Sequence, residues 1–238
     1  MGYIPSEVFM HILIIILILL LLMLIYLPGA WLKRTLKKYE KPEDKFPGTG
    51  GQFASHLLKQ LKIQDIKVEQ TEQGDHYDPV DYCVRLSPPN YNGKTLTAIV
   101  VAAHEVGHAI QHKSHYGLFK LRTFLAVTAG ITEKVGVLLF MIMPLLSLIS
   151  RSPMVALIST LAAIAFMGIG VLVHLITLPV EWDASFKRAL PLLQAGNYLE
   201  EKDYPAARKI LKAAALTYVA GALSSLLNFT RWLTILRR

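Results

Sequence analysis

Residues Thr95–His112 read TLTAIVVAAHEVGHAIQH, and this stretch holds the most informative pattern in the chain. The run has no proline and one glycine, so a helix is the expected local structure. On a helix, His104 and His108 project from one face about one turn apart, and their imidazole nitrogens can converge on one Zn²⁺ ion. Glu105 lies beside them, where it can accept a proton from a water that the ion activates. The pattern His-Glu-x-x-His therefore predicts hydrolysis of a peptide bond.

The alternative to a zinc site is a pair of polar helix residues that bind no metal. Residues 98–103, which precede the motif, are all apolar, as in a buried helix. Two histidines in such a run would lose the hydrogen bonds of water and gain no partner, whereas a metal ion satisfies both. The extended metzincin motif is excluded, because it requires Gly at position 111 and His at position 114, and this chain has Gln111 and Ser114.

The composition indicates a membrane protein. Of the 238 residues, 53% are hydrophobic and 18% are charged, which is too apolar for an ordinary soluble domain. The net charge of +8 arises from Lys and Arg beside apolar segments, as in juxtamembrane anchors, so no nucleic-acid partner is expected. The single cysteine, Cys83, cannot form an internal disulfide, and nothing near it has the spacing of zinc ligands.

Apolar segments predict three or four transmembrane helices. Val8–Leu27 has about the 20 residues needed to span a bilayer, and the basic residues at 33–38 favour a retained anchor over a signal peptide. Further apolar blocks lie at 124–150 and 154–178. A last segment, Ala213–Leu236, has small residues at intervals of four, which suit close packing of membrane helices. This segment either spans the membrane fully or inserts only halfway into it.

Two strands and a polar turn precede the motif. Residues 66–71 and 80–86 are expected as strands, the second by its alternation of apolar and polar side chains. Between them, residues 73–79 form a turn rich in side chains that can bond a substrate, although polar hairpin loops without function are equally common. The result would be a small β-hairpin. The candidate contacts to the substrate or transition state are His76, Tyr77 and Tyr116.

Glu181 is the best candidate for a third metal ligand. A catalytic zinc site needs three protein ligands and a water position, and His₂Glu is such a set. Glu181 follows Pro179, which suits the first turn of a helix, and an acidic residue there could simply complement the helix dipole. Asp183 is the second choice as ligand. Asp183 and Ser185 are also candidate partners for an imidazole N–H.

The distribution of positive charge predicts the orientation. Residues 33–122 are rich in Lys and Arg, whereas the residues before the first span contain none. The positive-inside rule places the motif in the cytoplasm and the N-terminus outside the cell membrane. Two further spans return the chain to the cytoplasmic side, so that His104, His108 and Glu181 can meet.

The sequence thus predicts a mainly α, multi-pass membrane protein in five parts: a helical bundle with a cytosolic, zincin-like HExxH helix. The parts are an N-terminal transmembrane anchor (1–30), a cytosolic segment with the β-hairpin and the HExxH helix (31–122), two transmembrane helices (123–178), a cytosolic helix with the third zinc ligand (179–212) and a C-terminal membrane-associated helix (213–238).

The chain resembles the type 2 neutral zinc metallopeptidases, a YugP-like family of multi-pass membrane proteins, over nearly its whole length. This resemblance implies a membrane-bound zinc peptidase, distantly similar to the HtpX-type membrane gluzincins, whose downstream Glu ligand corresponds to Glu181. In the HtpX-type pattern an Asp follows four residues later, where this chain has Ser185. The segments that show the resemblance are Asp75–Pro79, Val84–Ser87, Val101–His112, Thr177–Ser185 and Ala213–Ala220.

The predicted function is a zinc-dependent endopeptidase of the gluzincin type, with Glu105 as general base. Its substrates would be peptides or proteins, with membrane proteins among the candidates; the oligomeric state is not predicted. One alternative is an intramembrane protease of the site-2 type, for which the apolar run 98–103 is too short to span. The other is a zinc-stabilised scaffold without turnover, which would need no base and would tend to close the fourth metal position.

Overall fold

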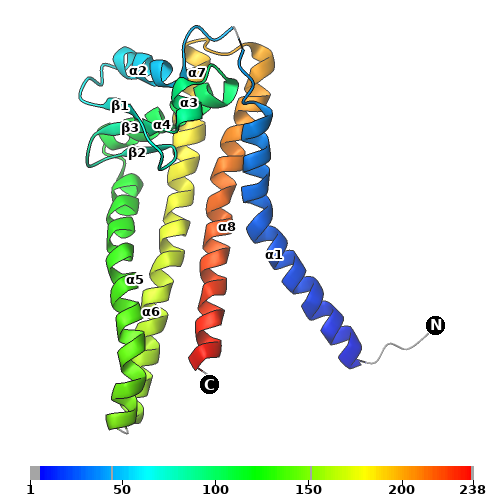
Figure 1. Ribbon diagram of the computed structural model, residues 1–238, viewed down its shortest axis with the longest axis vertical. Helices are drawn as coiled ribbons and strands as arrows, with labels where there is room; N and C mark the ends of the chain where they lie inside the picture. Colours follow the sequence, from blue (N-terminus) through cyan, green and yellow to red (C-terminus); the bar gives the residue numbers. More distant parts are fainter. Residues whose placement is uncertain (1–5, 44, 151, 237–238) are drawn as a thin grey trace, which may run out of the picture.

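Long helices and a small head make up the structure (Figure 1). The computed structural model describes residues 6–43, 45–150 and 152–236. Within them the chain is mainly helical with one small sheet, which confirms the expected fold class at this level. We call residues 39–116 and 183–203 the head. The long helices are α1 (Ser6–Lys38), α5 (Gly117–Ser150), α6 (Pro153–Trp182) and α8 (Tyr204–Leu236).

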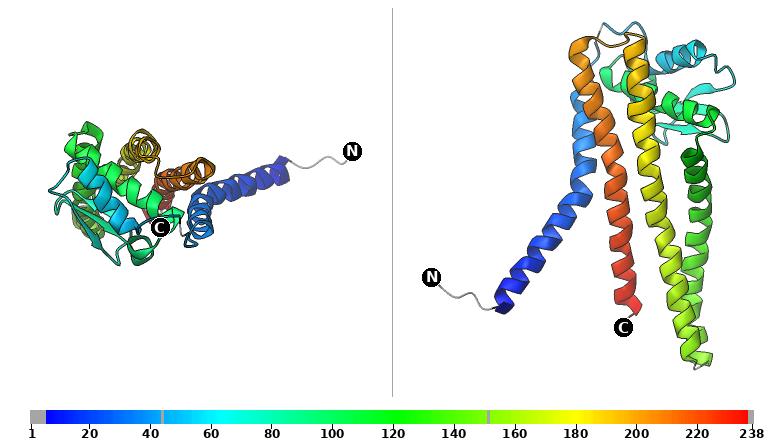
Figure 2. Two further views of the ribbon diagram at one scale, coloured as in Figure 1. Left: turned by 90° about the horizontal axis from the view of Figure 1, so that it is seen from above. Right: turned by 180° about the vertical axis from the view of Figure 1, so that it is seen from behind.

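The long helices extend side by side from the head. α5 packs along α6, α6 along α8, and α8 along the head-proximal part of α1 (Figures 1 and 2). Small residues let α8 approach α6 closely, because a Cβ on Gly221 would lie 2.6 Å from the ring of His174. Gly221, one of the small residues expected to line a packing face in the last segment, therefore lies against another long helix.

α1 continues without interruption past Pro28, so the basic residues after the apolar segment belong to the same helix. Proline has no backbone N–H to donate, which permits a bend, and the N-terminal part of α1 leans away from the other helices (Figure 2). Among the described residues, Glu7–Lys38 is the one helix found long and apolar enough to cross a membrane, and its most apolar 18-residue window has a mean hydropathy of 3.4. The other spans stay predictions. Residues 1–5, at the N-terminus predicted to lie outside the cell, are not among the described residues. Residues 237–238, the end of the predicted segment 213–238, are not among them either.

α4 (Leu96–Lys113) is the helix expected over residues 95–112. It begins where the Thr95 hydroxyl accepts a hydrogen bond from the Ala98 N–H at 3.0 Å, as N-cap residues do. Most of its apolar residues are buried in the core of the head. α2 (Gly50–Gln60) packs against it after a capping box at Thr49.

The sheet differs from the predicted hairpin. Strands β1 (Lys67–Gln70), β2 (His76–Asp78) and β3 (Cys83–Leu86) lie in the order β1-β3-β2. β1 and β3, expected as the two arms of one hairpin, pair in parallel, so that prediction is wrong. The hairpin is formed by β2 and β3, which pair in antiparallel fashion, and β2 lies inside the segment expected as a polar turn. The chain crosses from β1 to the far side of β3 through a turn at Gly74, whose φ of 88° suits glycine.

Pro179 does not begin a helix, contrary to the expectation from the sequence. It lies inside α6, which runs on to Trp182 and continues directly into a π-helix, η1 (Asp183–Ala189). Glu181 therefore lies inside a continuous helix rather than in a first turn with free N–H groups, and complementing a helix dipole does not explain it. The remaining elements are α3 (Pro88–Asn92), α7 (Leu190–Ala195) and the 3₁₀ turn η2 (Glu201–Asp203).

Gly107, inside the His-Glu-x-x-His motif, is the point where α4 comes closest to η1. A Cβ at this position would lie 2.8 Å from the carbonyl oxygen of Ala184, which is tighter than van der Waals contact allows. The absence of a side chain thus lets the backbone of η1 rest on α4. This contact places the motif beside the residues that follow Glu181.

Gly107→Ala should destabilise the protein, because the added Cβ would push α4 away from η1. We expect a loss of about 1–3 kcal/mol in the free energy of unfolding, seen as a fall in the Tm of detergent-purified protein of roughly 2–4 °C per kcal/mol. Gly117→Ala is the control, since nothing lies within 4 Å of a Cβ placed there. Equal Tm values for the two variants would contradict the close packing of α4 against η1.

Candidate metal centre

Two histidines of α4 and one glutamate of α6 meet in the interior. The ligand atoms of His104, His108 and Glu181 all lie within 4.8 Å of one another. The Glu181 Oε2 atom is 3.1 Å from His104 Nε2 and 3.3 Å from His108 Nε2. Glu181 is 2% and His108 5% exposed, so water solvates this cluster poorly.

The cluster fits a zinc ion. Ligands at about 2.0–2.1 Å from a tetrahedral zinc ion stand about 3.3 Å from one another, which matches the distances from Oε2 to the two imidazoles. The other oxygen, Glu181 Oε1, is buried and accepts no hydrogen bond from the described residues. Leaving a buried carboxylate oxygen unsatisfied is costly, and a divalent cation would compensate that cost. Two nitrogens and one oxygen also form a donor set typical of zinc.

Each imidazole has a hydrogen-bond partner at Nδ1, the nitrogen that does not face Glu181. The Ser185 Oγ atom lies 3.1 Å from His104 Nδ1, and the Gln111 Oε1 atom lies 2.9 Å from His108 Nδ1. Both rings therefore turn Nε2 towards Glu181. The sequence predicts Ser185 as a partner of an imidazole N–H, and the structure brings Ser185 and His104 together. Asp183 instead contacts Gln111, at 2.9 Å.

Two ionisable groups of the cluster have perturbed pKa values. Burial raises the pKa of Glu105 to about 7, an effect that the nearby His104 opposes. A bound cation would lower this value again, because it favours the ionised form. Burial by itself would also raise the pKa of Glu181, but His108 and His104 hold that pKa well below its usual range. This shift favours the ionised carboxylate, which is the form that a metal ligand requires.

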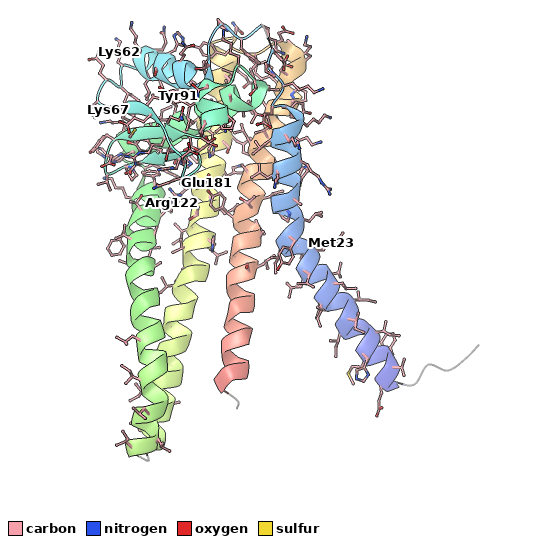
Figure 3. The ribbon with its side chains drawn as sticks, in the orientation of Figure 1. Met23, Lys62, Lys67, Tyr91, Arg122 and Glu181 are labelled. Atoms are coloured by element: carbon pink, nitrogen blue, oxygen red, sulfur yellow. The ribbon has the colours of Figure 1, made fainter. Side chains whose placement is uncertain are left out.

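The long helices contribute two polar groups that the sequence interpretation missed. Arg122 of α5 points a guanidinium nitrogen at Glu181 Oε1, 3.8 Å away, and its side chain is 29% exposed. Figure 3 labels Arg122 and Glu181 close together below the sheet, where α5 and α6 meet the head. Tyr218 of α8 lies near enough for its phenol to interact with Glu181 and Glu105. Motif spacing gives no signal for either residue, because both lie outside the motif and come from other helices.

The three residues proposed to contact the substrate form their described hydrogen bonds and ring contacts with residues outside the metal cluster. The Tyr77 hydroxyl lies 2.8 Å from His112 Nδ1, and His76 Nδ1 lies 2.9 Å from the Gly74 carbonyl oxygen. The Tyr116 ring lies under the guanidinium of Arg188, 5.6 Å away. These contacts do not include the metal cluster, and the suggested roles of the three residues stay predictions.

Comparison with known proteins agrees with a zinc site in this protein. A family model described as "Putative neutral zinc metallopeptidase" matches residues 13–237. A curated protein of Bacillus subtilis (strain 168), named "Putative membrane protease YugP", is 37% identical over 209 residues, which cover 86% of this chain and 88% of that protein. No solved structure matches the chain.

Glu181→Gln should abolish most zinc binding, because the amide is neutral and a far weaker ligand than the carboxylate. We expect about one zinc per chain in detergent-purified wild type and little in the variant, measured by atomic absorption. Glu200→Gln, which changes a half-exposed carboxylate in the head, is the control and should keep its zinc. A wild type without zinc would show that the two imidazoles and Glu181 form only a metal-free ion-pair cluster.

Proposed function

The chain belongs to the neutral zinc metallopeptidase family, and on that basis we propose that it is a membrane-bound zinc endopeptidase of the gluzincin type. The observation that supports this most strongly is the convergence of His104, His108 and Glu181, with Glu105 next to the first histidine. In this proposal the first three residues hold Zn²⁺ and Glu105 is the general base.

The reaction follows from what surrounds the cluster. His104, His108 and Glu181 would hold Zn²⁺, which would supply the Lewis acid for the attacking water and the scissile carbonyl. Glu105 accepts a proton from the attacking water and returns it to the leaving amine. Its buried position keeps bulk water from competing for that proton. Arg122 and Tyr218 are the donors we place near the negative charge that develops on the carbonyl oxygen, because both lie around the Glu181 carboxylate.

A catalytic role accounts for the cluster better than a scaffold. Among the described residues, the cluster offers three ligand atoms, which leaves a position open to water, as in catalytic zinc sites. Structural zinc sites are closed by a fourth protein ligand and have no use for a base such as Glu105. The motif helix α4 lies in the head rather than among the long helices (Figure 1), which disfavours a site-2-type protease.

We further propose that the long helices span the membrane and that the head lies in the cytoplasm. Residues 1–30 anchor the chain, the far parts of α5 and α6 form a helical pair within 123–178, and α8 is the fourth span within 213–238. The cytoplasmic parts are then 31–122 and 179–212. The strongly apolar α1, the membrane-protease name of the Bacillus relative and the basic residues of the head support this arrangement. Substrates would be peptides or proteins, including membrane proteins.

Glu105→Gln should lower the rate of casein cleavage by about 10²–10⁴-fold, the usual contribution of a general base, while zinc content stays that of the wild type. Casein cleavage by the wild type should also stop when a chelator removes the metal. Glu72→Gln, an exposed residue of the head, is the matched control. A zinc-bound Glu105→Gln protein that cleaves casein at the wild-type rate would exclude Glu105 as the base.

Cysteine labelling tests the orientation. In a Cys83→Ala background, Ser152→Cys, at the connection of α5 and α6, should react with a membrane-impermeant maleimide in intact cells. Gln73→Cys, in the head, should react only after the membrane is permeabilised. The reverse pattern, or labelling of both positions in intact cells, would contradict the proposed topology.

A further inference from the structure

Gln111 is a polar side chain in the interior of the head with no role in the mechanism above. It is fully buried and lies one turn beyond His108 on α4. Its side-chain oxygen lies 2.9 Å from His108 Nδ1. Its side-chain nitrogen donates to the Val180 carbonyl oxygen at 2.8 Å and to Asp183 Oδ2 at 2.9 Å.

These partners fix the direction of the amide. The Val180 carbonyl accepts hydrogen bonds only, and so does an ionised Asp183 carboxylate. The same Asp183 oxygen accepts a hydrogen bond from Arg188 Nε at 2.7 Å, which stabilises its negative charge. The NH₂ group of Gln111 therefore faces these two acceptors, and each of its hydrogens has one partner.

The orientation of the Gln111 amide in turn determines which ring nitrogen of His108 carries the hydrogen. With the NH₂ group turned to Val180 and Asp183, the Gln111 oxygen faces His108 Nδ1, and an oxygen acceptor requires a donor there. Nδ1 must carry the hydrogen, which leaves the lone pair of a neutral ring on Nε2, the nitrogen beside Glu181. Ser185 does not determine the tautomer of His104 in this way, because its hydroxyl can either donate or accept a hydrogen bond at Nδ1.

The same amide also holds the backbone next to the third ligand. Val180 immediately precedes Glu181, and its carbonyl is bound by a residue of α4. One side chain thus connects the helix that bears both histidines to the helix that bears the glutamate. Loss of this connection would loosen two of the three ligands at once.

We propose that Gln111 is a positioning residue that sets the His108 tautomer for metal binding and fixes the distance between α4 and the Glu181 backbone. The proposal rests on the metal site assigned above. It does not depend on which reaction that site performs, so it can fail while the peptidase assignment stands.

Two substitutions separate this role from simple packing. Gln111→Met keeps the size of the side chain but provides neither the acceptor nor the donors, so it should weaken zinc binding by about 10–100-fold, as loss of a ligand's hydrogen-bond partner does. Gln111→Glu keeps an oxygen acceptor for His108 Nδ1 and should bind zinc more tightly than Gln111→Met. A packing role predicts the opposite order, because an apolar side chain suits a buried site better than a carboxylate beside Asp183.

The measurement is the zinc dissociation constant by chelator competition, with the Tm of the metal-free proteins recorded in parallel. Gln60→Met, at an exposed position at the end of α2, is the control and should match the wild type. Zinc binding by Gln111→Met within about threefold of the wild type would overturn the proposal, as would weaker binding by Gln111→Glu than by Gln111→Met.

A second measurement uses the wild type and so does not depend on how the variants fold. In metal-free protein labelled with ¹⁵N-histidine, the signal that disappears in His108→Ala should be that of a ring protonated at Nδ1. A ring without a proton at Nδ1 would overturn the proposal. Failure to bind zinc or to cleave casein would instead count against the proposed function.

Discussion

The burial of the Glu181 carboxylate is the constraint on which the rest of the site depends. A charged group that is 2% exposed must be compensated by its surroundings. His104 and His108 face one of its oxygens from α4, and Arg122 faces the other from α5. A zinc ion held by these residues, as proposed above, would complete this compensation and would explain why an acidic residue lies so deep in the protein. Without such partners, burial at this position would oppose folding.

The close contact of α4 with η1 is what makes this burial geometrically feasible. Gly107 lets the two backbones meet at Ala184, so the residues on either side of that contact can bridge the helices. Ser185 reaches one imidazole and Gln111 reaches Val180 across the same contact. π-Helical turns such as η1 are frequent at functional sites, and here the turn directly follows the third ligand.

The site also joins the head to the long helices. Arg122 comes from the beginning of α5, Glu181 from the end of α6, and Tyr218 from α8. Ordering of the metal cluster therefore requires the helices to be correctly assembled, and a metal bound there would stabilise that assembly. The peptidase chemistry proposed for the head is accordingly coupled to the part of the chain that we place in the membrane.

The sequence alone determined the local features. The helix over residues 95–112 and the apolar first segment follow from short-range periodicity, and motif spacing together with family resemblance indicated Glu181 and Ser185. The tertiary structure decided which distant segments meet. It pairs 67–70 with 83–86 in parallel rather than as a hairpin, it brings Arg122 and Tyr218 to the site, and it joins Gln111 to Val180 and Asp183. Such contacts depend on packing between residues far apart in the chain, and local periodicity contains no information about that packing.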